Sequence, residues 1–252
     1  MRIAHISDIH CNNGIDFNPK MFDKATNLLN KYESDFIFIS GDLTSMGLLS
    51  EYEMAEKRLT EITGEKIIVP GNHDERNLGF KLFPEFFGKT DIIKTIKNIN
   101  IIGLASSEPD KDDGHLGRGR HKIIEEGLAK KKDLTIIGFH HHVIPIPNSG
   151  RETNIIEDAG ETLDILLRNN APLVLMGHRH VPYAVQVHKT LLVNAGTFSC
   201  TRTRAHFGNT FNIIDIEGAS ITINVVNVEK QSEKKIIHFD VKENTYFNKL
   251  YD

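Results

Sequence analysis

The chain has 252 residues, of which 39% are hydrophobic and 25% are charged, as is typical of a globular protein with a sizeable core. Its 30 basic and 34 acidic side chains leave a net charge of −4, which does not favour non-specific binding to nucleic acid. Two cysteines are too few for a disulfide framework, and the sequence has neither a signal-peptide pattern nor an apolar run of about 18 residues. We therefore expect a cytoplasmic protein with no membrane span.

Short apolar runs alternate with helical patterns over the first 176 residues. This alternation predicts β-sheets covered by helices, which is the layering of an α/β fold. The second helix is expected to begin at Ser50, with Glu53 in a capping box. In chain order the predicted strands cover residues 1–7, 35–40, 66–70, 91–96, 100–105, 134–139 and 171–176, and the predicted helices cover 21–32, 50–63, 80–87, 121–131 and 161–170.

From residue 181 the pattern becomes entirely β, with a hairpin signal at Glu217-Gly218. We expect a main domain at 1–216 and a C-terminal β extension at 217–252, packed on or next to the same domain. Because an edge strand can recruit a neighbour, the C-terminal strands could also pair between subunits and form a homo-oligomer. The predicted strands of this part cover 181–188, 190–196, 210–217, 220–229 and 235–241.

Polar side chains that can bind metals follow five of the predicted strands. In α/β folds ligands bind beyond the carboxyl ends of the strands, so these side chains are expected to meet. Within Asp8-Ile9-His10, as within residues 178–180, the two outer side chains would point the same way in an extended chain. Turn-forming polar residues are the alternative, but five coincidences would then be needed. The five segments are 7–10, 41–44, 70–74, 140–142 and 177–180.

The residue types in these segments indicate which metals they would bind. Mixed carboxylate, imidazole and amide ligands suit zinc, manganese or iron, and disfavour calcium or magnesium alone. A carboxylate can bridge two metals, and Asp42, which follows Gly41 in a tight turn, suits that role.

The segments also match known motifs in the expected order, over about residues 1–216. D-x-H, G-D-x-x-x-x-G, G-N-H-D, a histidine after a buried strand, and G-H-x-H resemble the calcineurin-like metallophosphoesterases. Within that superfamily the HHH run resembles the class III cyclic nucleotide phosphodiesterases. The resemblance implies a four-layer αββα sandwich and two metal ions. The first ion would be held by Asp8, His10, Asp42 and His180, and the second by Asp42, Asn72, His140 and His178.

The expected chemistry follows from two cations held by two carboxylates, a site that stays positive and attracts phosphate. A water between two such ions would ionise near neutrality and attack phosphorus in line. The resemblance gives His73 the role of stabilising or protonating the leaving oxygen. Asp74 would fix the tautomer and orientation of His73.

The histidine run and the later loops are expected to shape the pocket. His140 is the expected ligand, but a strand that ends one residue later would bring His141 instead. His141 would otherwise support the ligands or contact substrate, and His142 would lie on the surface. Further substrate contacts are expected from basic and small residues, or these are ordinary solvated loop residues. They are Arg151, Thr197, Arg202 and Arg204.

These observations predict a dinuclear-metal phosphodiesterase that hydrolyses a cyclic nucleotide or another small phosphodiester. A phosphomonoesterase or a nuclease on the same metal core is the alternative, and the absence of a strong positive charge disfavours a processive nuclease. A non-catalytic scaffold of the same fold is a further alternative, although every expected ligand position is filled.

Overall fold

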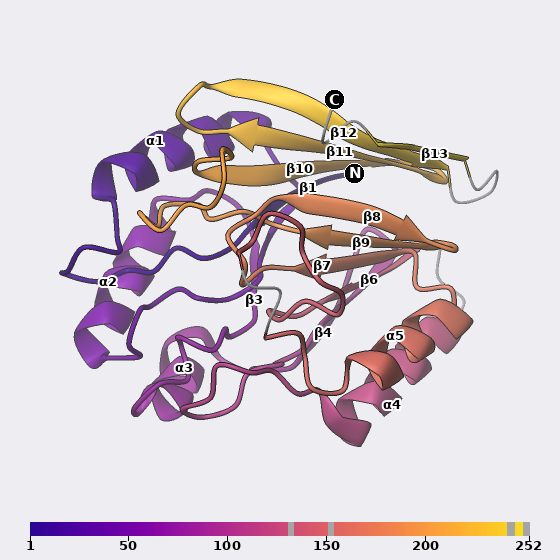
Figure 1. Ribbon diagram of the computed structural model, residues 1–252, viewed down its shortest axis with the longest axis horizontal. Coiled ribbons are helices and arrows are strands. Elements are labelled where there is room, and N and C mark those ends of the chain that lie inside the picture. The colour runs from indigo at the N-terminus through magenta and orange to yellow at the C-terminus, as the bar shows by residue number, and fades with distance from the viewer. Residues whose placement is uncertain (131–133, 151–153, 241–244, 249–252) are drawn as a thin grey trace.

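The computed structural model describes residues 1–130, 134–150, 154–240 and 245–248 of the chain, the last four by their backbone alone. These residues form two β-sheets that pack face to face, with helices on both outer faces (Figure 1). This arrangement confirms the expected four-layer α/β sandwich. Among the described helices, none is both long and apolar enough to cross a membrane.

Within the described residues, one sheet has seven strands in the order β13-β12-β11-β10-β1-β2-β3. Its β1, β2 and β3 run parallel, whereas β10 pairs with β1 in the antiparallel sense and begins a series of antiparallel strands. The strands span Arg2–Ile6 (β1), Phe36–Ile39 (β2), Lys66–Ile68 (β3), Thr210–Glu217 (β10), Ser220–Asn227 (β11), Ser232–Asp240 (β12) and Thr245–Asn248 (β13).

The other sheet has six strands in the order β4-β5-β6-β7-β9-β8, again counted over the described ranges. Its β5, β6, β7 and β9 are parallel, and an antiparallel strand lies at each edge. The strands span Ile92–Ile96 (β4), Ile99–Gly103 (β5), Leu134–Gly138 (β6), Leu173–Met176 (β7), Tyr183–Val187 (β8) and Thr190–Asn194 (β9).

The central strands are apolar on both faces because both faces are covered. In β2, Phe36 and Phe38 pack between the two sheets, while Ile37 and Ile39 pack under the helices. Such strands appear in a sequence as continuous apolar runs rather than as alternating patterns. Helices α1 (Pro19–Leu29), α2 (Leu49–Thr60) and α3 (Gly79–Phe87) cover the seven-stranded sheet, and α4 (Gly117–Ala129) and α5 (Ala159–Arg168) cover the other (Figure 1).

The expected cap of α2 is wrong. The helix begins at Leu49, so Ser50 already lies inside it. Glu51, rather than Glu53, caps the helix: its carboxylate accepts a hydrogen bond from the N–H group of Leu48, the residue before the helix, at 3.4 Å. It also accepts from the N–H groups of Ser45 and Met46, at 3.2 and 2.7 Å. This contact ties the loop after β2 to the helix.

The hairpin at Glu217-Gly218 is confirmed, since β10 and β11 pair over their whole length with Glu217 opposite Ser220. The strands on either side of residue 216 therefore belong to one sheet. The division into a domain at 1–216 and an extension at 217–252 stays a prediction.

Candidate metal centre

The expected ligands follow strands of both sheets, and they meet at the carboxyl ends of those strands, as is usual for ligand sites in α/β folds. The seven-stranded sheet supplies them from the loops after β1, β2 and β3. The six-stranded sheet supplies them from the loops after β6 and β7. In chain order they are Asp8, His10, Asp42, Asn72, His140, His178 and His180.

The expected extended conformation at D-x-H and at H-x-H is wrong. Five ligand residues have a positive φ, between +56° and +74°, in the left-handed region that residues other than glycine rarely adopt. Such strain concentrates at functional sites and persists only where surrounding contacts impose it. Here backbone hydrogen bonds between the loops do so, for example from Asp8 N to Gly41 O at 3.0 Å. The five residues are Asp8, His10, Asp42, His178 and His180.

The first half of the cage consists of Asp8, His10 and His180. His180 Nε2 lies 3.2 Å from Asp8 Oδ1 and 3.1 Å from His10 Nε2. Asp8 Oδ1 is buried and has no hydrogen-bond donor among the described residues. Its other oxygen accepts a hydrogen bond from His178 N at 3.1 Å, which fixes the carboxylate. A buried carboxylate oxygen without a donor fits a metal ligand.

The second half of the cage consists of Asn72, His140 and His178. Asn72 Oδ1 lies 3.1 Å from His140 Nε2 and 3.0 Å from His178 Nδ1, and the two ring nitrogens are 3.2 Å apart. Asp42 belongs to both halves, because its Oδ2 lies 3.5 Å from His10 Nε2 and 3.4 Å from His140 Nε2. One oxygen therefore faces both groups of ligands.

Backbone carbonyls set the tautomers of two ligand histidines. His140 Nδ1 donates to Ser40 O at 2.6 Å, and His180 Nδ1 donates to Arg202 O at 2.7 Å. Because a carbonyl can only accept, the proton sits on Nδ1 and the Nε2 lone pair faces the cage. This is the arrangement in which histidine binds metals.

The charges of the cage also fit cations. Burial alone would raise the pKa of Asp8, yet His180 and His10 hold it well below its usual range. Burial lowers the pKa of His10 to about 4. Burial likewise disfavours a charged His140, but Asp42 outweighs it and raises the pKa of His140 to about 9, so a cation bound in the cage would have to displace this second proton from Nε2. Carboxylates that stay ionised in a buried place need a positive charge beside them.

A close approach of two loops holds Asp42 in place. A Cβ on Gly71 would lie 2.2 Å from Asp42 Oδ1, so only glycine fits before Asn72. The same oxygen accepts a hydrogen bond from His73 N at 2.9 Å. The glycine of the G-N-H-D motif is thus explained by this contact.

His73 lies beside the cage, with its ring 4.6 Å from that of His10. The expectation that Asp74 orients it is wrong, because His73 Nδ1 donates to Ser45 O at 2.6 Å. The Asp74 carboxylate instead accepts from Thr44 N, Thr44 Oγ1 and Gly71 N, each at 2.9 Å. Asp74 therefore ties together the two loops that carry Asp42 and Asn72.

The three consecutive histidines have different partners, although the rings of His140 and His141 stay 5.0 Å apart. β6 ends at Gly138, and His140 reaches the cage. The ring of His141 turns toward another loop, where it contacts Ser106 Oγ at 2.9 Å and Asp112 O at 3.1 Å. His142 is fully buried, so the expected surface position is wrong. Its ring stacks on that of His178 at 5.7 Å.

A pocket of about 210 Å³ opens over the cage, and its rim is rich in arginine. Arg202 and Arg204 line it, and their contact with substrate stays a prediction. His141 and Thr197 lie behind the pocket instead: Thr197 is buried and its Oγ1 donates to Asp8 O at 2.7 Å. Arg151 lies outside the described residues. The pocket is lined by Asp42, Asn72, His73, Arg76, Asp112, Asn154, His178, Arg179, His180, Arg202 and Arg204.

Several residues at the site were not predicted. Arg76 lies two residues after Asp74, and Arg179 lies between the ligands His178 and His180. Their nearness to the motifs could therefore have indicated a place at the site. Cys200 Sγ lies within 4.8 Å of ligand atoms of His10 and His180, and burial raises its pKa. Asp112 stands 40 residues from Asn72, and nothing in the sequence connects the two.

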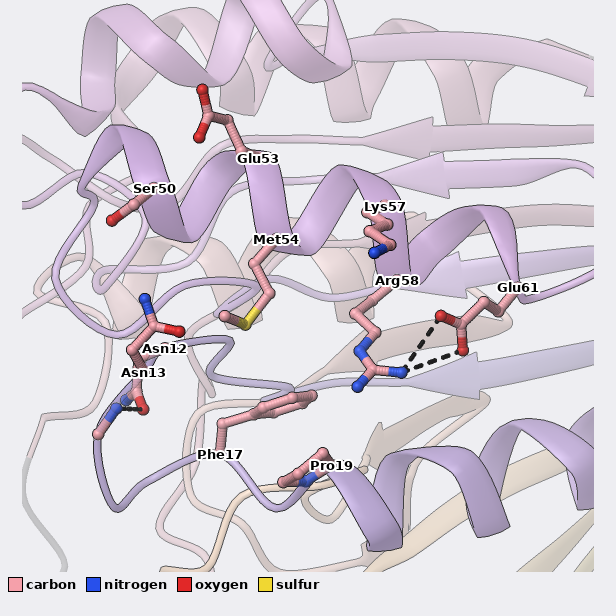
Figure 2. Close-up of a pocket in the computed structure, with 11 residues that line it drawn as sticks. Asn12, Asn13, Phe17, Pro19, Ser50, Glu53, Met54, Lys57, Arg58 and Glu61 are labelled. Carbon is pink, nitrogen blue, oxygen red and sulfur yellow. Dashed lines mark hydrogen bonds and ion pairs between the residues drawn. The ribbon is translucent and has the colours of Figure 1, made fainter.

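A larger hollow, of about 760 Å³, lies between α2 and the loop that follows His10. Figure 2 shows Phe17 and Arg58 in it, with the guanidinium directed to Glu61. Arg58 also pairs with Asp23 at 2.9 Å, so its charge is already balanced. Size alone would favour this hollow, but the convergent ligand atoms are in the smaller one.

Comparisons with known proteins agree with this geometry. The family model for calcineurin-like phosphoesterases matches residues 1–182. A probable cyclic nucleotide phosphodiesterase of Coxiella burnetii is 27% identical over 213 residues, which cover 77% of this chain and 82% of the relative. A probable glycerophosphodiester phosphodiesterase of Arcobacter nitrofigilis is 26% identical over 155 residues, 56% of this chain and 57% of the relative.

Among solved structures, a purple acid phosphatase from yellow lupin seeds has a similar fold, with a TM-score of 0.73 at 14% identity. The likeness covers 93% of this chain and 52% of the lupin chain. The matching family model and the relatives that are named phosphodiesterases support a metal-dependent phosphoric ester hydrolase, and the cage at the strand ends agrees with it. Since the family model spans more than half of the sequence, the chain belongs to the calcineurin-like phosphoesterase family, whose members use a dinuclear metal centre.

Proposed function

We propose that the protein is a phosphodiesterase that acts on a cyclic nucleotide or another small phosphodiester with two metal ions. The observation that carries this proposal is the position of Asp42 Oδ2, 3.5 Å from His10 Nε2 and 3.4 Å from His140 Nε2. A carboxylate oxygen between two sets of ligands suits a bridge between two cations.

The residues of the cage would divide between the two ions. Asp8, His10 and His180 would hold one, Asn72, His140 and His178 would hold the other, and Asp42 would bind both. Manganese, iron or zinc suits this mixture of ligands. When bound, two such ions lower the pKa of a water nucleophile and neutralise the charge that develops on the phosphoryl oxygens.

His73 would act on the leaving oxygen. Its Nδ1 donates to Ser45 O, which leaves Nε2 as the atom that can hold or deliver a proton in the pocket. The backbone bond from His73 N to Asp42 Oδ1 keeps the imidazole at a fixed distance from the bridging carboxylate.

Arg202 and Arg204 would bind the remainder of the substrate. Arg202 already contacts Asp16 at 3.3 Å, whereas Arg204 donates to the neutral carbonyl of Ser149 at 2.9 Å. Guanidinium groups at a pocket rim suit phosphate or carboxylate groups, which they bind through paired hydrogen bonds. Arg151 keeps its proposed role in substrate binding, and a cytoplasmic location and a homo-oligomeric state stay predictions.

The preference for a diester is supported by relatives that are named phosphodiesterases. The test compares bis-p-nitrophenyl phosphate with p-nitrophenyl phosphate, each with added Mn²⁺ and with a chelator. We expect Mn²⁺-dependent hydrolysis of both, faster for the diester. A faster monoester reaction would favour the phosphomonoesterase. No metal-dependent hydrolysis of either ester would favour the scaffold.

A further inference from the structure

Asn72 is the ligand whose metal-binding atom depends on the orientation of an amide. Its side chain is buried and carries an oxygen, which can bind a metal, and an NH₂ group, which cannot. The carbonyl oxygen must face His140 and His178 for Asn72 to act as a ligand. The oxygen and the NH₂ group of an amide have nearly the same shape, so packing does not distinguish the two orientations. The hydrogen-bond partner of the NH₂ group must therefore fix the orientation.

The Asp112 carboxylate lies on that other side. Asn72 Nδ2 donates to Asp112 Oδ1 at 3.1 Å. An ionised carboxylate can only accept hydrogen bonds. A reversed amide would place its oxygen against this carboxylate and its NH₂ group against the ligand atoms of the cage. The contact with Asp112 therefore excludes the orientation that cannot bind a metal.

Asp112 is itself held from two directions. Arg76 Nη2 forms an ion pair with Asp112 Oδ1 at 2.6 Å, and this guanidinium also lowers the pKa of the carboxyl, so it stays ionised. The backbone oxygen of Asp112 accepts a hydrogen bond from His141 Nε2 at 3.1 Å. The ring of His141 in turn packs against that of His178, with centroids 4.8 Å apart.

The first half of the cage has no such dependence on Asp112 within the part of the chain that the structure describes. There, His180 is held by the carbonyl of Arg202 and Asp8 is held by the N–H of His178. The side chain of Asp112 therefore contacts a ligand of the second half and none of the first, as far as the described residues go.

We propose that Asp112 is a positioning residue, which orients the Asn72 amide and thereby sets the affinity of the second metal ion. The proposal rests on the proposed function, since it assumes two ions in the cage. Partners that orient metal ligands typically contribute about 10- to 100-fold in metal affinity. Replacement of the Asp112 side chain should lower the affinity for the second ion by that factor and leave the affinity for the first ion close to its wild-type value.

The experiment uses the full chain freed of metal by a chelator and then titrated with Mn²⁺ against a competing indicator. We compare the wild type with Asp112→Asn, which has nearly the same size but can donate as well as accept. Asp113→Asn is the matched control, because it removes the same charge from the next residue. Asp112→Glu restores an acceptor-only group and should recover most of the lost affinity.

The expected result is two ions in the wild type, one of them weakened about 10- to 100-fold in Asp112→Asn, with no change in Asp113→Asn. The melting temperature in chelator should be the same for Asp112→Asn and for the control. Two wild-type affinities in Asp112→Asn, or an equal loss at both sites, would overturn the role of Asp112 and leave the proposed function standing. A wild type that binds no Mn²⁺ would overturn both.

Discussion

The two halves of the cage contain similar atoms but are held in different ways. In the first half, backbone groups hold His180, through Arg202 O, and Asp8, through His178 N, while His10 Nδ1 lies 3.4 Å from the side-chain Nη2 of Arg202. In the second half, a backbone group also holds His140, through Ser40 O, but Asn72 depends on the side chain of Asp112. A hydrogen bond to a backbone group remains when the side chain of that residue is replaced, whereas a hydrogen bond to the side chain itself is lost. Asp112 is therefore the position at which a side-chain substitution should weaken the second half alone.

The largest effect should follow from removing the group that both halves share. Asp42→Ala eliminates the carboxylate oxygen that faces both His10 and His140. The ligands of the two halves would then lack the negative charge that they share. We expect both ions to bind weakly and activity on a phosphodiester to fall by about 10⁴-fold or more. Metal content after dialysis and steady-state hydrolysis measure this. Retention of both ions at wild-type affinity would mean that the halves are independent.

A smaller effect, on activity alone, should follow at His73, which lies beside the cage but outside both halves. His73→Ala removes the proposed proton donor, so turnover should fall by about 10²- to 10⁴-fold while both ions stay bound. The exposed His238 on β12 provides the control, as His238→Ala. Equal losses of metal and of activity in His73→Ala would show that His73 supports the cage rather than the leaving group.

The buried side chain of Glu75, the residue after Asp74, gives a prediction about stability. Burial raises the pKa of Glu75 to about 7, Ser107 opposes this shift, and Asp74 adds to it. Because its pKa is higher in the folded state, the protonated Glu75 side chain adds to the free energy of unfolding. This contribution is full below about pH 4.5, the usual pKa, and is lost as the pH rises through about 7. Glu75→Gln should raise the free energy of unfolding relative to wild type by about 1–2 kcal/mol at pH 8, and by less at pH 5.

Denaturant unfolding of the metal-free chain at both pH values measures this effect. The control is Glu85→Gln on the exposed face of α3, which should have the same small effect at both pH values. A Glu75→Gln variant that is no more stable than wild type at pH 8 would show that ionisation of Glu75 does not lower the free energy of unfolding.

The smallest effect should appear at the rim. Arg204 contacts a carbonyl and not the cage, so Arg204→Ala should raise KM about 3- to 10-fold with kcat and metal affinity nearly unchanged. The matched change Arg118→Ala, on the exposed start of α4, should leave KM as it is. A fall in kcat with KM unchanged would place Arg204 in the transition state rather than in substrate binding.

Much of the site was predictable because its residues follow strands, and strand ends can be found from apolar runs. Asp42, Asn72 and His140 come from separate strands, yet each is found by its position after one. Their backbone conformation was not predictable in this way. The left-handed φ of Asp8, for example, results from contacts with a loop more than thirty residues away.

The contacts between loops could not be predicted from the sequence either. Asp74 was assigned to its neighbour His73, but its carboxylate reaches Thr44 and Gly71. His142 is expected on the surface, but it is fully buried and its ring stacks on that of His178. Such pairings are fixed by tertiary packing, which a local pattern does not contain.

The claim on which this account depends is that Asp42 joins two ligand sets into one dinuclear site. Anomalous diffraction from crystals of the wild type loaded with Mn²⁺ tests it most directly. We predict two metal peaks about 3.5–4 Å apart, with Asp42 Oδ2 between them. A single peak, or two peaks that do not share Asp42, would contradict the account.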